Sequence, residues 1–167
     1  DRARRLAYAC RSPRTDEGLA REWAREMGYV PVVFDAASPD CTPVYHTNVL
    51  LWIGERICGC GLDWVDETQR GMLDSTLREG GRDLLRLDGA ALRGYAGNML
   101  ELGSGPDASL LAASRTAWNS LSGAQRDQLE QAACRVVLAD IPTIETLGGG
   151  SLRCMLAEVP PCPGPPC

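Results

Sequence analysis

The sequence predicts an α/β fold assembled from repeated strand, strand, helix, strand modules. The order of elements is the first reason, because strand-like segments and segments with helical spacing follow one another in the same order twice. The second reason is an echo 50 residues apart, in which residues 48–50 (NVL) correspond to residues 98–100 (NML). A period of this length indicates a supersecondary unit that packs on its neighbours. With 167 residues, 44% of them hydrophobic, the chain can bury the core of one domain.

The first part of the chain predicts a strand, a helix and a second strand. Residues 4–10 (RRLAYAC) alternate weakly, and residues 29–36 (YVPVVFDA) are rich in β-branched side chains, so both favour strands. Between them, residues 15–28 begin with Thr and Asp, carry apolar residues at helical spacing and end on Gly. These are ordinary start and stop signals of a helix.

A complete module is predicted next. Residues 48–61 (NVLLWIGERICGCG) favour two strands around the turn GER. Residues 63–81 have helical spacing and are closed by glycines, and residues 83–88 (DLLRLD) return to a strand pattern.

The second module repeats this order. Residues 98–114 predict a hairpin with a Gly/Pro turn, residues 114–134 a helix with a break near LSG, and residues 135–140 (RVVLAD) a strand. Residues 141–159 (IPTIETLGGGSLRCMLAEV) then predict a short segment, a glycine loop and a final strand that begins near Cys154.

Composition and missing motifs exclude several functions. The net charge is −5 and the 17 basic residues, all Arg, are scattered along the chain, which argues against nucleic acid as a partner. The absence of Lys removes lysine-based covalent catalysis. No run of 18 apolar residues suggests a membrane span. Neither the G-x-S-x-G motif of serine hydrolases nor a phosphate-binding loop occurs.

The cysteines favour free thiols over disulfides or zinc. Most of the eight lie in apolar runs, where a cysteine behaves as a small buried hydrophobic residue. We therefore expect a reducing compartment and a cytoplasmic location. A zinc site is the competing interpretation, but only Cys58 and Cys60 are closely spaced and His46 is the only histidine.

One thiol stands in a setting suited to chemistry. The segment GGGS (residues 148–151) precedes Cys154, and a glycine-rich backbone can approach a substrate closely beside a thiol. The alternative is a flexible loop before a buried structural cysteine. His46 could be a structural residue, yet a cysteine nucleophile needs such a base or proton donor. Glu101 could be a site carboxylate or part of a solvated strand face.

Four segments, in this order and spacing, resemble the guanidino-group-modifying, amidinotransferase-like (pentein) superfamily. They are PVYHTNVLLWIG, YAGNMLEL, SLSGAQRDQLE and IPTIETLGGGSLRCMLAEV. The match runs from about Leu6 to Val159 and is closest to citrulline-utilisation hydrolases. The resemblance implies a five-bladed α/β propeller of strand, strand, helix, strand modules. Residues 1–159 would be the C-terminal part of one such catalytic domain, without the upstream modules, and residues 160–167 a Pro-rich disordered tail.

The resemblance also implies roles for individual residues. Cys154 would be the nucleophile and His46 the general acid and base. In arginine-processing relatives the histidine motif resembles His-x-Asp, whereas this chain has Asn48, which favours a neutral ureido group over a cationic guanidinium. Asn48 could also be a turn-capping residue. The remaining expected substrate-binding residues belong to the glycine segment and its continuation: Gly149, Gly150, Ser151 and Arg153.

The leading functional hypothesis is therefore a cysteine-dependent hydrolase of C–N bonds in a small ureido or guanidino compound. The specific expectation is hydrolysis of citrulline to ornithine, ammonia and carbon dioxide, without a metal or organic cofactor. An arginine-directed deiminase or amidinotransferase is the enzymatic alternative. A non-catalytic remnant that lacks the upstream half of the site is the alternative of another class. The oligomeric state and the roles of Cys162 and Cys167 are left open.

Overall fold

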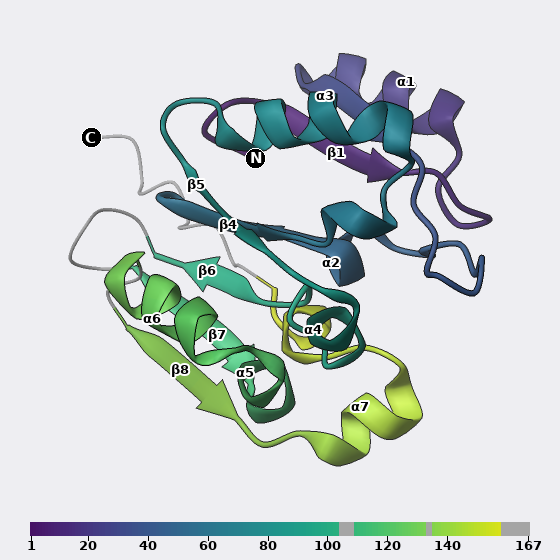
Figure 1. The fold of residues 1–167 in the computed structure, drawn as a ribbon. Helices are drawn as coiled ribbons and strands as arrows, with labels where there is room; N and C mark the ends of the chain where they lie inside the picture. The colour runs from purple at the N-terminus through teal and green to yellow at the C-terminus, as the bar shows by residue number, and fades with distance from the viewer. Residues whose placement is uncertain (104–108, 133–134, 158–167) are drawn as a thin grey trace, which may run out of the picture.

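The structure is a computed structural model that describes residues 1–103, 109–132 and 135–157. These residues form a mixed α/β arrangement with three small sheets, each built from strands that are consecutive in the chain (Figure 1). The predicted α/β class is confirmed. The described residues form no closed barrel or ring of sheets, so the number of propeller blades stays a prediction.

The first unit consists of β1 (Leu6–Cys10), α1 (Glu17–Met27) and β2 (Val30–Phe34), as predicted. The Asp16 carboxylate accepts a hydrogen bond from the first turn of α1, and Gly28, with φ 68°, ends the helix in the left-handed conformation. Strands β1 and β2 pair in parallel, as strands joined by a crossover helix do.

The second unit follows the predicted module. It contains β3 (Leu51–Ile53), β4 (Ile57–Cys60), α3 (Glu67–Arg78) and β5 (Asp83–Arg86), with a 3-10 turn, η1 (Leu62–Trp64), before the helix. Strand β4 lies in the middle of the sheet, antiparallel to β3 and parallel to β5.

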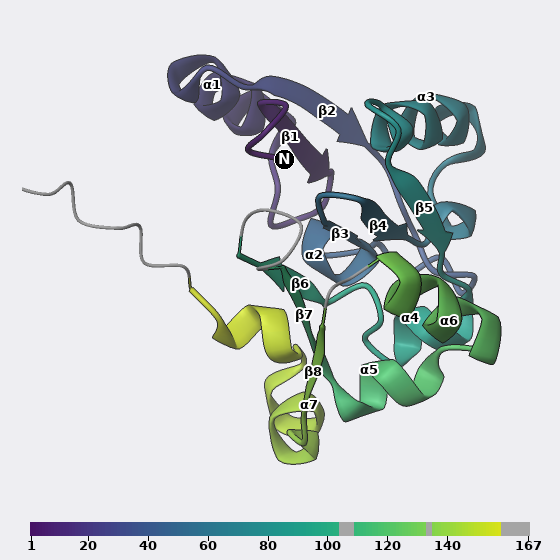
Figure 2. The same ribbon diagram turned by 90° about the vertical axis from the view of Figure 1, so that its left-hand side faces the viewer.

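The segment that leads into β3 is helical, which corrects the prediction of a strand from residue 48. It forms one turn, α2 (Thr47–Leu50). The Thr47 hydroxyl accepts a hydrogen bond of 2.9 Å from the backbone N–H of Cys10, at the end of β1. This tertiary hydrogen bond and the bonds of the helical turn take the place of the hydrogen bonds between strands that a longer β3 would need. Figure 2 shows α2 near the middle of the molecule, close to β3.

The third unit repeats the second. A short helix, α4 (Gly89–Arg93), leads to a sheet whose order and strand directions match those of the second sheet. Two helices, separated where the sequence predicts a break, replace the single helix of the second unit. Its other elements are β6 (Leu100–Leu102), β7 (Leu110–Ser114), α5 (Arg115–Ser120), α6 (Gly123–Ala132) and β8 (Val136–Ala139). The internal repeat inferred from the sequence is thus confirmed at the level of topology.

The last described segment differs from its prediction. After α7 (Pro142–Gly148) the chain forms a second 3-10 turn, η2 (Leu152–Met155), in place of a final strand. The Cys154 N–H donates to the Ser151 carbonyl at 3.0 Å, a bond within the turn that an extended strand would not make. Residues 158–167, and with them the predicted tail, lie outside the described residues, as does Cys134.

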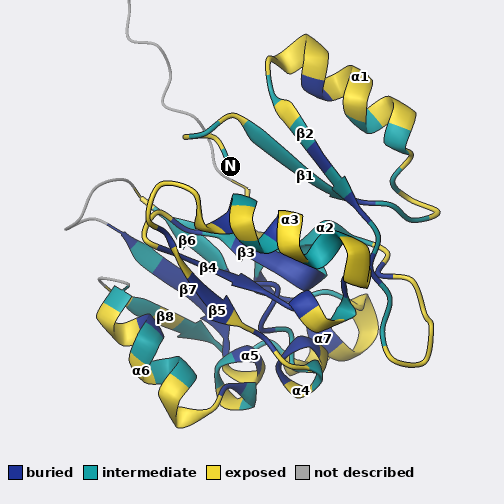
Figure 3. Cartoon of the chain, turned by 45° about the horizontal axis from the view of Figure 1, so that its top comes forward, coloured by how far each residue is buried: buried dark blue, intermediate teal, exposed yellow. Residues whose placement is uncertain are grey.

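One hydrophobic cluster joins the three units, and strands β4, β5 and β7 contribute much of it (Figure 3). The cysteines at positions 10, 41, 58, 60 and 154 are free thiols, as predicted for this part of the chain. Burial raises the pKa of both Cys10 and Cys58 to about 11, so these thiols stay neutral and act as core residues. No helix within the described residues is long and apolar enough to cross a membrane.

Candidate active site

The glycine segment before Cys154 has two positions that require glycine. Gly149 has a φ of 66°, in the left-handed region that glycine adopts without strain. A Cβ on Gly150 would lie 3.0 Å from the Cys154 sulfur, closer than side chains normally approach. Gly148 has no such constraint, since its nearest neighbour would be 3.7 Å away. The segment therefore shapes the backbone around the thiol, as its sequence suggests.

The Cys154 thiol is exposed and meets two amide side chains. Its Sγ lies 3.3 Å from Nδ2 of Asn98 and 3.7 Å from Nδ2 of Asn48. An amide N–H can donate a hydrogen bond to a sulfur that carries negative charge. The structure thus brings together Cys154 and Asn48, two of the residues that the sequence predicts for the site.

Asn98 is a site residue that the sequence analysis does not identify. It is 1% exposed and is held from both ends of its amide. Nδ2 donates to the backbone carbonyl of Asn48 at 2.9 Å, and Oδ1 accepts from the Ser151 N–H at 3.2 Å. The signal that could have found it is the internal echo, because Asn98 is the counterpart of Asn48 in the repeat.

A buried carboxylate fixes the serine of the glycine segment. Glu145, 5% exposed, accepts hydrogen bonds from the Ser151 hydroxyl at 2.7 Å and from the Thr116 hydroxyl at 2.6 Å. The Tyr95 hydroxyl donates to the Glu145 backbone carbonyl at 2.9 Å, and burial raises the pKa of Tyr95. Ser151 is therefore a structural link between Glu145 and Asn98. The sequence motif did not indicate the role of Glu145.

Arg153 makes its hydrogen bond to the backbone of β3 rather than to the sulfur. Its Nη1 donates to the Leu51 carbonyl at 3.1 Å, which ties η2 to the start of β3. Burial lowers the pKa of the guanidinium, and the neighbouring Cys154 opposes that shift. Arg153 and Asn48 both line a cavity of about 410 Å³, which also reaches Tyr8 on β1 and Trp23 on α1.

Asn48 has one polar atom without a partner. Its Oδ1 is buried and accepts no hydrogen bond from any described residue. Buried acceptors are normally satisfied, so this atom is an exception, and a bound molecule could donate to it only if the amide or its neighbours moved to expose it. Asn48 therefore has a donor near the sulfur and a buried acceptor without a partner.

His46 lies directly before α2, two residues from Asn48. Its ring packs edge-on against Tyr45, with centroids 4.8 Å apart, and the Tyr45 hydroxyl donates to the Gly149 carbonyl at 2.6 Å. Tyr45 thus connects the neighbourhood of His46 to the glycine segment. Within the described ranges the imidazole makes no hydrogen bond, to Cys154 or to another residue.

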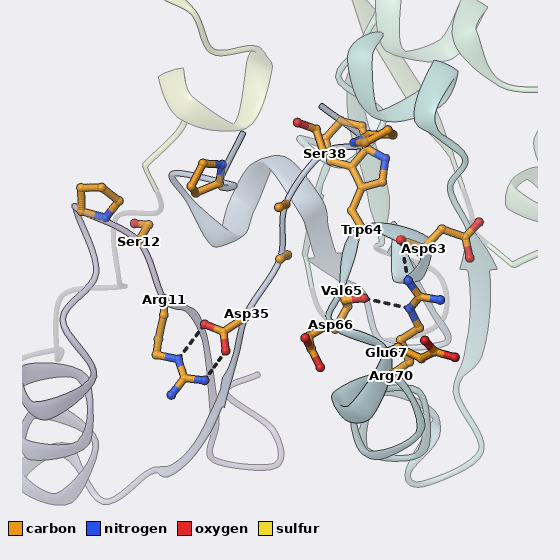
Figure 4. A pocket seen from close by; sticks show the side chains of 15 residues that line it. Arg11, Ser12, Asp35, Ser38, Asp63, Trp64, Val65, Asp66, Glu67 and Arg70 are labelled. Atoms are coloured by element: carbon orange, nitrogen blue, oxygen red, sulfur yellow. Dashed lines mark hydrogen bonds and ion pairs between the residues drawn. The ribbon is translucent and has the colours of Figure 1, made fainter. Parts of the chain in front are cut away.

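A larger cavity, of about 720 Å³, lies elsewhere and contains none of the predicted site residues. Figure 4 shows the Arg11–Asp35 ion pair on one side of it and Trp64 and Arg70 on the other. We assign the site to the cavity of about 410 Å³ that Asn48 and Arg153 line, because these two residues neighbour Cys154, which is not itself among the lining residues. Glu101 is used elsewhere, since it accepts hydrogen bonds from Ser109 and from the backbone of Glu55. No three His, Cys, Asp or Glu side chains among the described residues gather as metal ligands would.

The fold resembles solved structures of ArgZ, an arginine dihydrolase from the ornithine–ammonia cycle in cyanobacteria. The apo structure matches with a TM-score of 0.72 and 13% identity, over 93% of this chain and 22% of that chain. The substrate-bound N-terminal domain matches with a TM-score of 0.66 and 14% identity, over 92% of this chain and 51% of that chain. The N-terminal domain with a covalently bound reaction intermediate has a TM-score of 0.64 and 13% identity, over 89% and 49%. The chain thus spans about a fifth of the full ArgZ chain and about half of its N-terminal domain.

The family comparison agrees with these structures. No curated protein sequence matches the chain. The model of the family described as eukaryotic N,N dimethylarginine dimethylhydrolase matches residues 1–160, almost the whole chain. The resemblance to guanidino-group-modifying enzymes is thereby confirmed, and the chain belongs to the family of eukaryotic N,N dimethylarginine dimethylhydrolases.

Proposed function

We propose that this chain carries the nucleophile of a hydrolase that cleaves C–N bonds of guanidino or ureido compounds. The observation that carries the proposal is the exposed Cys154 sulfur. Cys154 follows the glycine segment in the chain, and its sulfur lies within hydrogen-bonding distance of two amide donors. Membership of a family named for a hydrolase of dimethylarginine supports it. The ArgZ domain with a covalently bound intermediate supports a covalent route on this fold.

In the proposed first step the Cys154 thiolate attacks the planar carbon of the substrate. A C–S bond forms, and the electron pair of the C=N or C=O bond moves to its heteroatom, which gives a tetrahedral adduct. The adduct collapses and expels the amine, which takes a proton from His46. His46 then removes a proton from water, the resulting hydroxide attacks the same carbon, and the C–S bond breaks to restore the thiolate.

The substrate is the finer part of the proposal. The family name points to N,N-dimethylarginine, which would yield citrulline and dimethylamine. Asn48 instead favours a neutral ureido group, as in citrulline, because its amide supplies no charge to pair with a guanidinium. The family name and the Asn48 argument thus point to different substrates, and arginine-type compounds are kept beside citrulline as candidates. Gly149, Gly150, Ser151 and Arg153 would shape the wall against which the substrate lies.

The wider architecture is proposed in the same way. The repeated sheets support an α/β propeller of which residues 1–159 are a part, with carboxylates for the substrate nitrogens on modules beyond these residues. A small-molecule substrate and a cytoplasmic location remain part of this hypothesis.

The test is product release from three compounds assayed in parallel: N,N-dimethylarginine, L-arginine and L-citrulline. Amines, citrulline and ornithine are quantified by mass spectrometry for the chain and for Cys154→Ser. We expect turnover of at least one compound and its loss in Cys154→Ser. Turnover that survives this substitution would overturn the mechanism, and no release from any compound would favour the non-catalytic remnant.

A second variant tests the substrate preference. Asn48→Asp restores the His-x-Asp pattern, so we expect turnover of arginine-type compounds to rise relative to citrulline. Asn119→Asp is the matched control, because Asn119 is an exposed residue of α5. An unchanged ratio in Asn48→Asp would contradict the role given to Asn48.

A further inference from the structure

We propose that Asn98 is a catalytic residue that binds the Cys154 thiolate, together with Asn48, its counterpart in the internal repeat. This inference rests on the proposed function only in taking Cys154 as the nucleophile. Asn98 lies outside the histidine and glycine motifs, and the proposal gives it a direct contact with the reacting sulfur.

The amide of Asn98 can serve both protonation states of the sulfur. Oδ1 lies 3.5 Å from Sγ and can accept the S–H of the neutral thiol, whereas Nδ2 lies 3.3 Å from Sγ and can donate to the thiolate. Both distances are within the range of hydrogen bonds to sulfur, which is a large and weak acceptor when neutral and a better one when charged. Asn98 therefore retains a bond to the sulfur before and after the proton leaves.

Neighbouring groups determine which way this amide points. The Ser151 N–H can bond only to an acceptor, so it requires Oδ1 on its side, and the Asn48 carbonyl requires Nδ2 on the other. Gly97 permits the second bond, because a Cβ there would lie 2.2 Å from the Val49 carbonyl oxygen. The donor is thus held in place before the thiolate forms, and stabilising the charge requires no rearrangement.

The two asparagines are the side-chain hydrogen-bond donors to Sγ among the described residues. Arg153, which is adjacent in the chain, directs its guanidinium to the Leu51 carbonyl. The other titratable groups around the turn are Glu145 behind Ser151, and Tyr45 and His46 before α2. A substitution of Asn98 does not alter these four groups. A change in the reactivity of the Cys154 thiol is then due to the loss of the Asn98 amide.

The experiment measures alkylation of Cys154 by iodoacetamide as a function of pH, resolved at the level of peptides by mass spectrometry. The thiolate is the reactive species, so the rate follows the thiolate fraction. Two variants are compared. Asn98→Asp replaces the amide donor by a negatively charged carboxylate of nearly the same shape, and Asn98→Ala removes the donor. Asn119→Asp, at an exposed position, is the matched control, and the exposed Cys41 is an internal reference.

We expect Asn98→Asp to move the alkylation profile of Cys154 to higher pH by about one unit, which is about tenfold slower reaction below the midpoint. Asn98→Ala is expected to shift it in the same direction by less. The profile of Cys41 stays constant in both variants, and Asn119→Asp leaves both thiols unchanged. A Cys154 profile that is the same in Asn98→Asp and in the unsubstituted chain would overturn the inference.

Buried Cys58 reports whether each variant is folded, because it reacts only when the core opens. If Asn98→Asp fails this check, Asn98→Ser takes its place, since a hydroxyl can still donate to the thiolate. Its profile should then lie between those of the unsubstituted chain and Asn98→Ala, and a profile equal to Asn98→Ala would count against the inference. An Asn98 effect without turnover of any substrate would sink the proposed function and leave thiolate binding by Asn98 standing.

Discussion

At the scale of single residues, the site depends on backbone positions as much as on reactive side chains. Gly150 leaves room for the sulfur, and Ser151 anchors the turn through both its hydroxyl and its N–H. These contacts explain why a thiol can be exposed and yet have a defined position. They also predict different effects of substitutions at different positions of the glycine segment.

Gly150→Ala is expected to displace the Cys154 sulfur, because the added Cβ would lie 3.0 Å from it. Displacement of a reacting atom by up to about 1 Å lowers the rate about tenfold to a hundredfold. Alkylation of Cys154 and substrate turnover would both be measured. Gly148→Ala is the control, since its Cβ meets ordinary contact distances, and equal losses in the two variants would refute the steric role of Gly150.

Ser151→Ala should lower the free energy of unfolding, because it removes one of the two hydroxyls that bond the buried Glu145 carboxylate. Leaving a buried polar group short of a partner costs about 1–3 kcal/mol. Urea denaturation would measure the change. Ser75→Ala, at an exposed helix position, should be neutral. An unchanged free energy of unfolding in Ser151→Ala would contradict the stabilising role given to this hydrogen bond.

At the scale of elements, ion pairs join the first strand, the first helix and the second strand. Arg11, just after β1, forms a two-bond pair with Asp35 after β2 and a 2.7 Å bond to Glu17 in α1. The bonds from Arg11 hold the pKa of Asp35 below its usual range, and those from Arg21 and Arg11 do the same for Glu17. All these groups are partly exposed, so the pairs contribute modestly.

This pairing predicts a pH dependence. A lowered carboxyl pKa contributes stability above the pKa of the unfolded chain, near 4, and loses it as pH falls through the folded value. Asp35→Asn should therefore cost up to about 1 kcal/mol at neutral pH, and the difference should vanish in acid. Thermal unfolding at several pH values would measure it, with exposed Asp127→Asn as the control. A difference that persists well below pH 4 would contradict the ionic origin.

The elements with strong local signals are those that the sequence predicts well. Asp16 and Gly28 mark the ends of α1, and the alternating segments of both modules become the expected strands. The errors occur where tertiary contacts decide the backbone. Thr47 bonds to the end of β1 and makes α2 helical, and the turn at Ser151 makes η2 a 3-10 turn in place of a strand.

The candidate site divides in the same way. Cys154 and Asn48 carry recognisable motifs, and the structure brings them together. Asn98 acts through hydrogen bonds to residues 50 and 56 positions away, and Glu145 joins nearby Ser151 to Thr116, which is 29 positions away, so local spacing does not encode these roles. Only the 50-residue echo pointed to Asn98, and it did so through topology rather than chemistry.

At the scale of the whole molecule, buried thiols make the core sensitive to alkali. Burial raises the pKa of Cys10 and Cys58 to about 11, and that of Cys60 further. Unfolded thiols ionise near pH 8.5, so these raised values stabilise the fold below that pH, and the contribution is lost as pH rises towards the folded values.

The free energy of unfolding is therefore expected to fall above about pH 9, by at most about 1.4 kcal/mol per pH unit for each thiol. Urea denaturation across this range would measure the slope. Replacing Cys10, Cys58 and Cys60 by Ala should flatten it even though the core is weakened, whereas Cys41→Ala should leave it unchanged because Cys41 is exposed. If the free energy of unfolding falls equally steeply with pH in the triple variant, the loss of stability at high pH comes from other groups.

The contact of Cys154 with one asparagine from each repeated module has a consequence for the newly made chain. Asn48 precedes the second sheet, Asn98 precedes the third, and the cysteine follows both. The sulfur is synthesised after both amides, and it can contact both only when the two modules and η2 are in place. The environment of two amide donors is therefore a property of the assembled fold, and we expect the reactivity of Cys154 to report on that assembly.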